Sequence, residues 1–132
     1  MWFVPTELSF SAIHVRAKTE WVHVSISDGS GTVGQGEITS TQLQRDVSPV
    51  VARLANSLRG QRLVDDSDVL KLNKLVTGRL ENDPIMATAV SGLRCAVADA
   101  LARRAQLPLV DYLRELYDHR GTAEREVQLY AN

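Results

Sequence analysis

The spacing of apolar residues changes once along the chain, near Ile38, and this change limits the folds that the sequence can adopt. Before Ile38, apolar residues alternate with polar ones, as they do in strands with one buried face. After it, they recur at intervals of three and four, as they do in amphipathic helices. Strands and helices in separate blocks favour an α+β fold over alternating βαβ units.

The first block predicts a three-stranded antiparallel meander. Its clearest strand is residues 21–27, in which valine and isoleucine alternate with polar residues. The run Asp28-Gly29-Ser30-Gly31 is a strong turn signal, and residues 32–38 form the partner strand. An earlier strand lies within residues 3–17. Together these segments predict one small sheet at the start of the chain.

Two glycines interrupt the predicted strand 32–38, in the run Gly34-Gln35-Gly36-Glu37. Glycine inside a strand marks a bulge or the close approach of another backbone. A phosphate-binding loop would need a following lysine and a helix N-terminus, and this run has no lysine. We therefore interpret it as strand geometry, with Glu37 either exposed or bridging to a neighbouring helix.

The second block predicts a bundle of three to four helices. Ser48-Pro49 is a favourable helix start, with residues 40–47 as a less certain extension, and Gly60 can end this helix. The next helix opens at Asp65-Asp66-Ser67 and closes at Gly78.

The longest predicted helix begins at Asp83-Pro84, again a capping residue followed by proline. Apolar residues, many of them alanine, recur along it at helical spacing for about five turns. It ends before Leu107-Pro108, and a short helix covers residues 109–116. Asp99 lies four residues before Arg103 on the long helix, so the two can form an ion pair.

Composition excludes several classes of function. Fifteen basic residues face sixteen acidic ones, for a net charge of −1, and no basic stripe suggests nucleic acid or an anionic membrane as a partner. No apolar run approaches the length of a membrane span, and the N-terminus does not resemble a signal peptide. Cys95, the only cysteine, cannot form an intrachain disulfide, which fits a cytoplasmic location, and we expect it to be a small buried apolar residue.

No arrangement of side chains predicts a catalytic or metal site in this chain. The acidic residues Asp65, Asp66 and Asp68 lack the closing glutamate of a calcium loop, so helix capping is the expected role. The three histidines, at positions 14, 23 and 119, do not have the spacing of a zinc site.

Four segments in order resemble one family. These are residues 22–37 (VHVSISDGSGTVGQGE), 58–60 (LRG), 89–109 (AVSGLRCAVADALARRAQLPL) and 127–132 (VQLYAN). Each is weak alone, but together they resemble the N-terminal capping domain of the enolase superfamily, of the mandelate racemase and muconate lactonizing enzyme type. The sequence departs from the family pattern at Arg103-Arg104, where a less charged turn is usual.

The resemblance implies a parent isomerase or lyase that abstracts a proton alpha to a carboxylate of a small organic acid. In the family, Mg²⁺ and the catalytic bases belong to a barrel domain, which takes about 250 residues and cannot fit in this chain. The resemblance thus assigns residues 1–126 to the capping domain and 127–132 to the first strand of a missing barrel. It implies no catalytic residue, metal or cofactor within the chain itself.

The resemblance also implies a segment that closes over the active site and shapes specificity. Phe10, Ile13 and His14 are the candidates, and the sequence leaves open whether they lie in this flexible loop or in a strand. An alternative function is a free-standing, cap-like module that binds partners or forms a homo-oligomer through its apolar helix faces, without catalysis.

Overall fold

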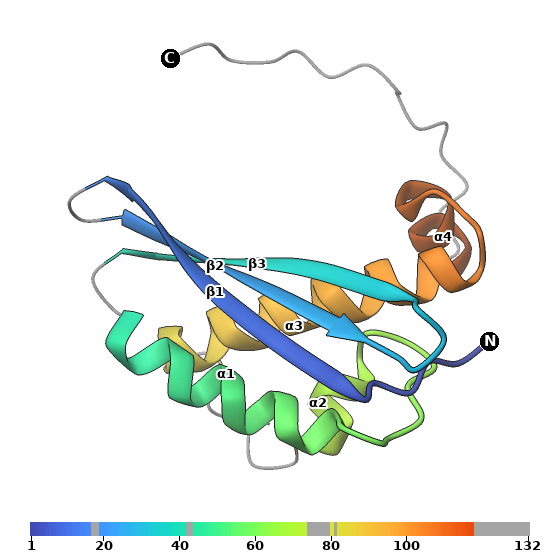
Figure 1. The fold of residues 1–132 in the computed structure, drawn as a ribbon, viewed down its shortest axis with the longest axis horizontal. Helices are drawn as coiled ribbons and strands as arrows, with labels where there is room; N and C mark the ends of the chain where they lie inside the picture. Colours follow the sequence, from blue (N-terminus) through green and yellow to red (C-terminus); the bar gives the residue numbers. More distant parts are fainter. Residues whose placement is uncertain (17–18, 42–43, 74–79, 81, 118–132) are drawn as a thin grey trace, which may run out of the picture.

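The computed structural model describes residues 1–16, 19–41, 44–73, 80 and 82–117 of the 132-residue chain. Three strands precede four helices (Figure 1), in the order β1 (Glu7–Arg16), β2 (Thr19–Ser27), β3 (Val33–Thr41), α1 (Gln44–Leu58), α2 (Asp68–Leu72), α3 (Pro84–Arg104) and α4 (Leu109–Leu116). This confirms the α+β class and the block order predicted from the sequence. The described residues contain no barrel.

The sheet is the predicted antiparallel meander, with strand order β1-β2-β3. Val22 lies opposite Ala12 on one side and Ile38 on the other, so these three residues share one face. The β1–β2 register shifts between His14 and Arg16, which marks an irregularity near the end of the hairpin.

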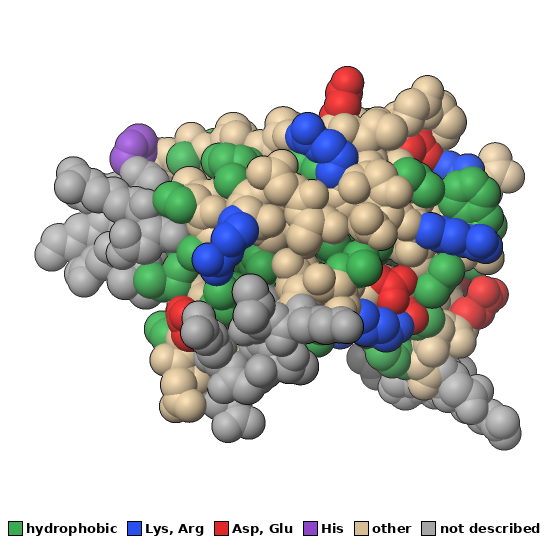
Figure 2. All heavy atoms as spheres, turned by 90° about the horizontal axis from the view of Figure 1, so that it is seen from below, with side chains coloured by type: hydrophobic (Ala, Val, Ile, Leu, Met, Phe, Trp, Pro, Cys, Tyr) green, Lys and Arg blue, Asp and Glu red, His purple; other side chains and the backbone are tan. Residues whose placement is uncertain are grey.

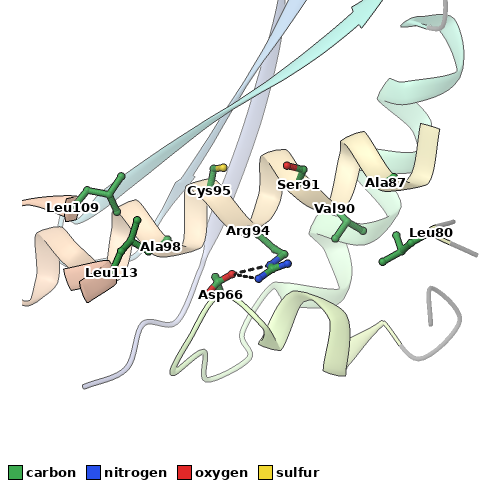
Figure 3. A pocket seen from close by; sticks show the side chains of 10 residues that line it. All are labelled: Asp66, Leu80, Ala87, Val90, Ser91, Arg94, Cys95, Ala98, Leu109 and Leu113. Atoms are coloured by element: carbon green, nitrogen blue, oxygen red, sulfur yellow. Dashed lines mark hydrogen bonds and ion pairs between the residues drawn. The ribbon is translucent and has the colours of Figure 1, made fainter. Parts of the chain in front are cut away.

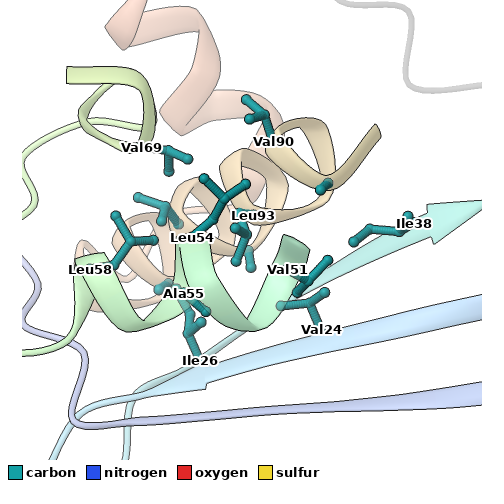
Figure 4. Close-up of a cluster of buried hydrophobic side chains, with 14 of the residues drawn as sticks. Val24, Ile26, Ile38, Val51, Leu54, Ala55, Leu58, Val69, Val90 and Leu93 are labelled. Atoms are coloured by element: carbon teal, nitrogen blue, oxygen red, sulfur yellow. The ribbon is translucent and has the colours of Figure 1, made fainter. Parts of the chain in front are cut away.

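Helices α1 and α3 pack on the sheet, α4 packs against α3, and the core fills the space between the sheet and these helices (Figures 1 and 4). The sheet contributes four fully buried residues, Val22, Val24, Ile26 and Ile38. The apolar faces of α1 and α3 complete the core, as the helical spacing predicted. Figure 2 shows the helix side of the molecule, where Lys and Arg side chains are spread among acidic and apolar ones.

Helix α1 begins at Gln44, upstream of the predicted start at Ser48-Pro49, so the predicted extension is real from residue 44 onward. The reason is Val47, which is fully buried and continues the apolar stripe of Val51 by one turn. Pro49 lies inside the helix on its exposed side. The predicted end is confirmed, because Gly60 has the left-handed φ of 74° that suits a glycine after a helix.

Helix α2 is shorter than predicted. It spans only Asp68–Leu72 and ends at Asn73, whose side chain donates to the carbonyl oxygen of Val69 at 2.8 Å. Gly78, the predicted end, lies outside the described residues. The loop before α2 holds Leu63, which pairs with Phe3 through two main-chain hydrogen bonds of 2.9 Å and so fixes the N-terminal segment against it.

Helices α3 and α4 match their predictions. Asp83 accepts a hydrogen bond from the Met86 amide at 3.0 Å, and Pro84 occupies the first turn. Helix α3 is long and apolar enough to cross a membrane by length and composition, but 61% of the relevant window is buried inside the domain. In this structure it is the central core helix, packed against β3.

Candidate functional site

The closest contact between the two layers is the crossing of β3 and α3, and glycines make it possible. A Cβ added at Gly34 would overlap the Ala96 carbonyl oxygen and lie 2.6 Å from the Ala100 Cβ. A Cβ at Gly36 would overlap the Gly92 carbonyl oxygen. Of the two interpretations of these glycines, close backbone approach is therefore the one confirmed.

Asp99 of α3 reaches the outer edge of β3. Its carboxylate accepts a hydrogen bond from the Gln35 amide and another from Arg103 Nε, each at 2.9 Å. The predicted ion pair between Asp99 and Arg103 is confirmed. The contact with Gln35 was not predicted, and it gives the only acidic residue of α3 a partner on the sheet. Glu37 is exposed.

The turn between β2 and β3 is tied to the end of α3 through Asp28 and Arg104. Asp28 accepts hydrogen bonds from the amides of Ser30 and Thr32, and its other carboxylate oxygen pairs with Arg104. Burial acts to raise the pKa of Asp28, but these hydrogen bonds and the charge of Arg104 outweigh it, so the pKa is lowered.

Two guanidinium groups lie over the indole ring of Trp2. Arg62 is 5.1 Å and Arg104 is 5.3 Å from the ring centroid, which places both within cation–π range. Arg104 thus contacts both the Trp2 ring and the Asp28 carboxylate, and Arg103 pairs with Asp99. The departure from the family pattern at Arg103-Arg104 therefore has a structural role.

A groove of about 350 Å³ opens on the side of α3 that faces away from β3. The loop before α2, helix α3 and helix α4 form its walls (Figure 3). Its lining is mainly apolar, and the residues are Asp66, Leu80, Ala87, Val90, Ser91, Arg94, Cys95, Ala98, Leu109 and Leu113. The expectation that Cys95 is buried is wrong, because this residue lies on the groove side of α3 and its side chain is exposed.

An ion pair links the walls of the groove. Asp66 is only 5% exposed, and its carboxylate accepts hydrogen bonds from Arg94 Nε at 2.7 Å and from the Tyr117 hydroxyl at 2.9 Å. Burial opposes the charge on Arg94, but the bond to Asp66 outweighs it and raises the pKa of Arg94. The same carboxylate raises the pKa of Tyr117.

Tyr112 of α4 lies partly buried beside this ion pair. Burial, together with the negative charges of Asp66, Asp65 and Asp68, raises the pKa of Tyr112 to about 12. The phenol therefore stays protonated throughout the physiological range. The described part of the groove thus combines the Asp66–Arg94 ion pair with a phenol that stays protonated at neutral pH.

The acidic cluster Asp65, Asp66 and Asp68, at the start of α2, makes no side-chain hydrogen bond that caps this helix, so the predicted capping role is not found. Asp65 accepts hydrogen bonds from the backbone and side chain of Ser67, which precedes the helix. Asp68 accepts from the Val64 amide at 2.7 Å and pairs with Lys71 at 2.9 Å. Asp66, as described above, turns toward α3.

These carboxylates do not fit a magnesium site. No group of three or more His, Cys, Asp or Glu side chains that could hold a metal occurs among the described residues. Asp65, Asp66 and Asp68 are each already bonded to neighbours within the domain.

The candidate specificity residues lie on β1, so the structure favours strand over loop for this segment. Phe10 is opposite Val24 on the helix-covered face, and Ile13 is opposite Trp21 on the other face. Their side chains are 42% and 47% exposed. His14 is also exposed, one residue from the register shift near the hairpin end. The three therefore do not converge on one pocket, and their role in specificity stays a prediction.

The meander, the glycine contact and the four following helices define an α+β capping domain of the enolase-superfamily type. A family model describes this type as the mandelate racemase / muconate lactonizing enzyme N-terminal domain, and it matches residues 2–113. The chain belongs to this family.

Solved structures support the same fold. A mandelate racemase/muconate lactonizing enzyme from Bordetella bronchiseptica RB50 is 24% identical with a TM-score of 0.67, over 86% of this chain and 34% of that one. A mandelate racemase/muconate lactonizing protein from Herpetosiphon aurantiacus is 26% identical with a TM-score of 0.57, over 80% and 31%. L-talarate/galactarate dehydratase from Salmonella typhimurium LT2 is 22% identical with a TM-score of 0.56, over 85% and 32%.

This chain thus spans about a third of the length of the solved enzymes that it resembles. No functionally curated protein matches the sequence. The segment predicted to enter the barrel, residues 127–132, lies outside the described residues and outside the matched range. The boundary predicted at residue 126 therefore stays a prediction.

Proposed function

We propose that this chain is the N-terminal capping and specificity domain of a magnesium-dependent enzyme that abstracts a proton alpha to the carboxylate of a small organic acid. The parent would be a racemase, dehydratase or cycloisomerase. The observation that carries the proposal is the family match over residues 2–113, joined to structural likeness with only the capping third of complete enzymes. The domain would be inactive on its own.

The chemistry explains why a second domain is needed. An alpha proton of a carboxylate is very weakly acidic, so its removal requires a positioned base together with an electrophile that stabilises the enolate. Magnesium, bound in the barrel, would supply that stabilisation. The described residues hold no metal cluster, so we place the reacting groups in a barrel that is downstream in the same protein or supplied separately.

The part that we assign to this chain is to exclude water and select the substrate. The closed end of the β1–β2 hairpin, between Arg16 and Thr19, lies beside the end of β3, where Thr19 pairs with Thr41. We propose that this end faces the barrel mouth, with Ile13 and His14 near the substrate and Phe10 further along β1. The exposed, unpaired thiol of Cys95 is consistent with a cytoplasmic location.

The intact mass of the natural protein in its source cells tests this proposal. A cap with a barrel of about 250 residues predicts a product of roughly 380 residues. That product should exchange the alpha proton of its organic acid with D₂O only when Mg²⁺ is present, and the 132-residue chain should not. A natural product of 14.6 kDa with no barrel partner would contradict the proposal and favour the free-standing module.

A further inference from the structure

The two edges of the sheet differ in how they are covered. On β3, the outward-facing Gln35 amide is bonded by Asp99 of α3. Strand β1, ten residues long, forms the opposite edge, and within the described part of the chain only β2 pairs with it. An uncovered strand edge presents unpaired N–H and C=O groups to any other strand that approaches it.

Main-chain hydrogen bonds identify the residues that face this open edge. The Asp28 amide donates to the Thr32 carbonyl oxygen at 3.1 Å, so the even-numbered residues of β2 bond to β3. The odd-numbered residues of β2 bond to β1, because the main-chain N–H and C=O groups of any one residue in an antiparallel ladder both point to the same neighbouring strand. The register pairs odd with odd residues. Leu8, Phe10 and Ala12 therefore turn their N–H and C=O groups outward.

The side chains along this edge lack the features that keep edge strands apart. Residues 8–15 include no proline and no Lys, Arg, Asp or Glu, which are the residues that usually guard such an edge. Phe10, Ile13 and Val15 are 42%, 47% and 41% exposed. Phe10 is on the helix-covered face, yet the helices of its own chain do not bury it.

We propose that the β1 edge binds the β1 edge of a second copy of this chain, antiparallel, to form a continuous six-stranded sheet. A two-fold axis makes one edge serve both partners, so the surface is complementary to itself. The outward main-chain N–H and C=O groups of the even-numbered β1 residues then bond to those of the second copy. The helices of both copies lie on the same face of the joined sheet. The register that overlaps residues 7–15 fully places Phe10 opposite Ala12 of the second copy, where its ring becomes covered.

This inference rests on the geometry of β1 and not on the proposed function, so it is tested by mass and not by activity. Sedimentation equilibrium of the 132-residue chain should give twice the monomer mass of 14.6 kDa at micromolar concentration. Ala12→Pro removes an outward N–H while leaving the bonds to β2 intact. Phe10→Lys adds a charge to the same edge. Each should weaken dimerisation at least tenfold.

The matched control is Val110→Lys, which changes an apolar residue of similar exposure on α4 (48%, against 42% for Phe10). This variant should keep the wild-type dimer. Circular dichroism checks that all three variants remain folded. A wild-type chain that stays monomeric at hundreds of micromolar would overturn the proposal, as would a dimer that Val110→Lys dissociates and the β1 variants do not.

A cross-linking experiment tests the same contact without weakening it. In the proposed register Ser11 faces Ser11 of the second copy as a non-hydrogen-bonded pair, with Cα atoms about 4.5 Å apart, within disulfide range. In a Cys95→Ser background, Ser11→Cys should form disulfide-linked dimers at least tenfold faster than Ser25→Cys, which lies one strand further in on the same face. Equal rates for the two variants would refute the edge-to-edge contact.

Discussion

Gly34 and Gly36 have no side chains because α3 leaves no space for any. At both positions the atom nearest to an added Cβ is a carbonyl oxygen of the helix backbone. A backbone cannot rotate away as a flexible side chain can, so any larger residue must push β3 and α3 apart. The spacing of two glycines at alternate positions follows from the pleat of the strand, which directs both toward the same helix.

Gly36→Ala should therefore lower the free energy of unfolding by about 3 kcal/mol, because overpacking a rigid contact forces the layers apart. Urea denaturation followed by circular dichroism measures the change. Gly29→Ala is the control, since a Cβ there meets nothing within 4 Å, and it should change stability by less than about 0.5 kcal/mol. Equal losses for the two variants would contradict the role assigned to the glycine contact.

Asp28 should make the domain sensitive to acid. Its pKa is lower in the folded chain than the ordinary value of 3.8, so its contribution to stability is present above about pH 4 and is lost as the pH falls through the folded-state pKa. Asp28→Asn keeps an acceptor for Ser30 and Thr32 but loses the charge. Thermal melts between pH 2 and 7 should show a weaker dependence on pH below 4 for this variant than for wild type.

At the scale of elements, Asp99 joins α3 to the edge of β3. Asp99→Ala leaves the Gln35 amide without its acceptor and should cost about 1–2 kcal/mol of stability, as the loss of a charged hydrogen-bond partner does. Arg103→Ala removes only the exposed member of the ion pair and should cost less than about 0.5 kcal/mol. Chemical denaturation of both variants tests the order, and a larger loss for Arg103→Ala would reverse the assignment.

The sequence predicted most elements because their ends carry local signals. Asp83-Pro84 marks the start of α3 through a side-chain cap and a fixed φ, and both act within one turn. The start of α1 was predicted less sharply, between residue 40 and Ser48, because the proline suggested a first turn while the burial of Val47 depends on tertiary packing. Tertiary contacts of this kind are not visible in the neighbouring sequence.

At the scale of the whole molecule, Asp66 connects the loop before α2 with α3 and with Tyr117 after α4. Asp66→Ala should cost about 2–3 kcal/mol, because it removes two hydrogen bonds and leaves Arg94 half-buried without its partner. A double-mutant cycle with Arg94→Ala should yield a coupling free energy of about 1 kcal/mol or more. Additive losses in that cycle would show that the pair does not act as a unit.

The candidate site was predicted less completely than the fold. The sequence predicted a capping domain, and the family match supports that assignment. It did not predict the groove on α3, since Asp66 and Arg94 are 28 residues apart and the spacing of charges does not reveal which will meet. It also placed Cys95 in the core, because a helix with alanine on several sides does not show which face is exposed.

The crossing of β3 with α3 has a consequence for how the chain is made. Gln35 and Asp99, which meet there, are 64 residues apart in the sequence, and an isolated small sheet is at best marginally stable in water. During translation, the strands therefore leave the ribosome well before the helix that covers them. The apolar face of the sheet stays exposed until α3 has been synthesised. Cooperative folding can therefore begin only when most of the domain has left the ribosome.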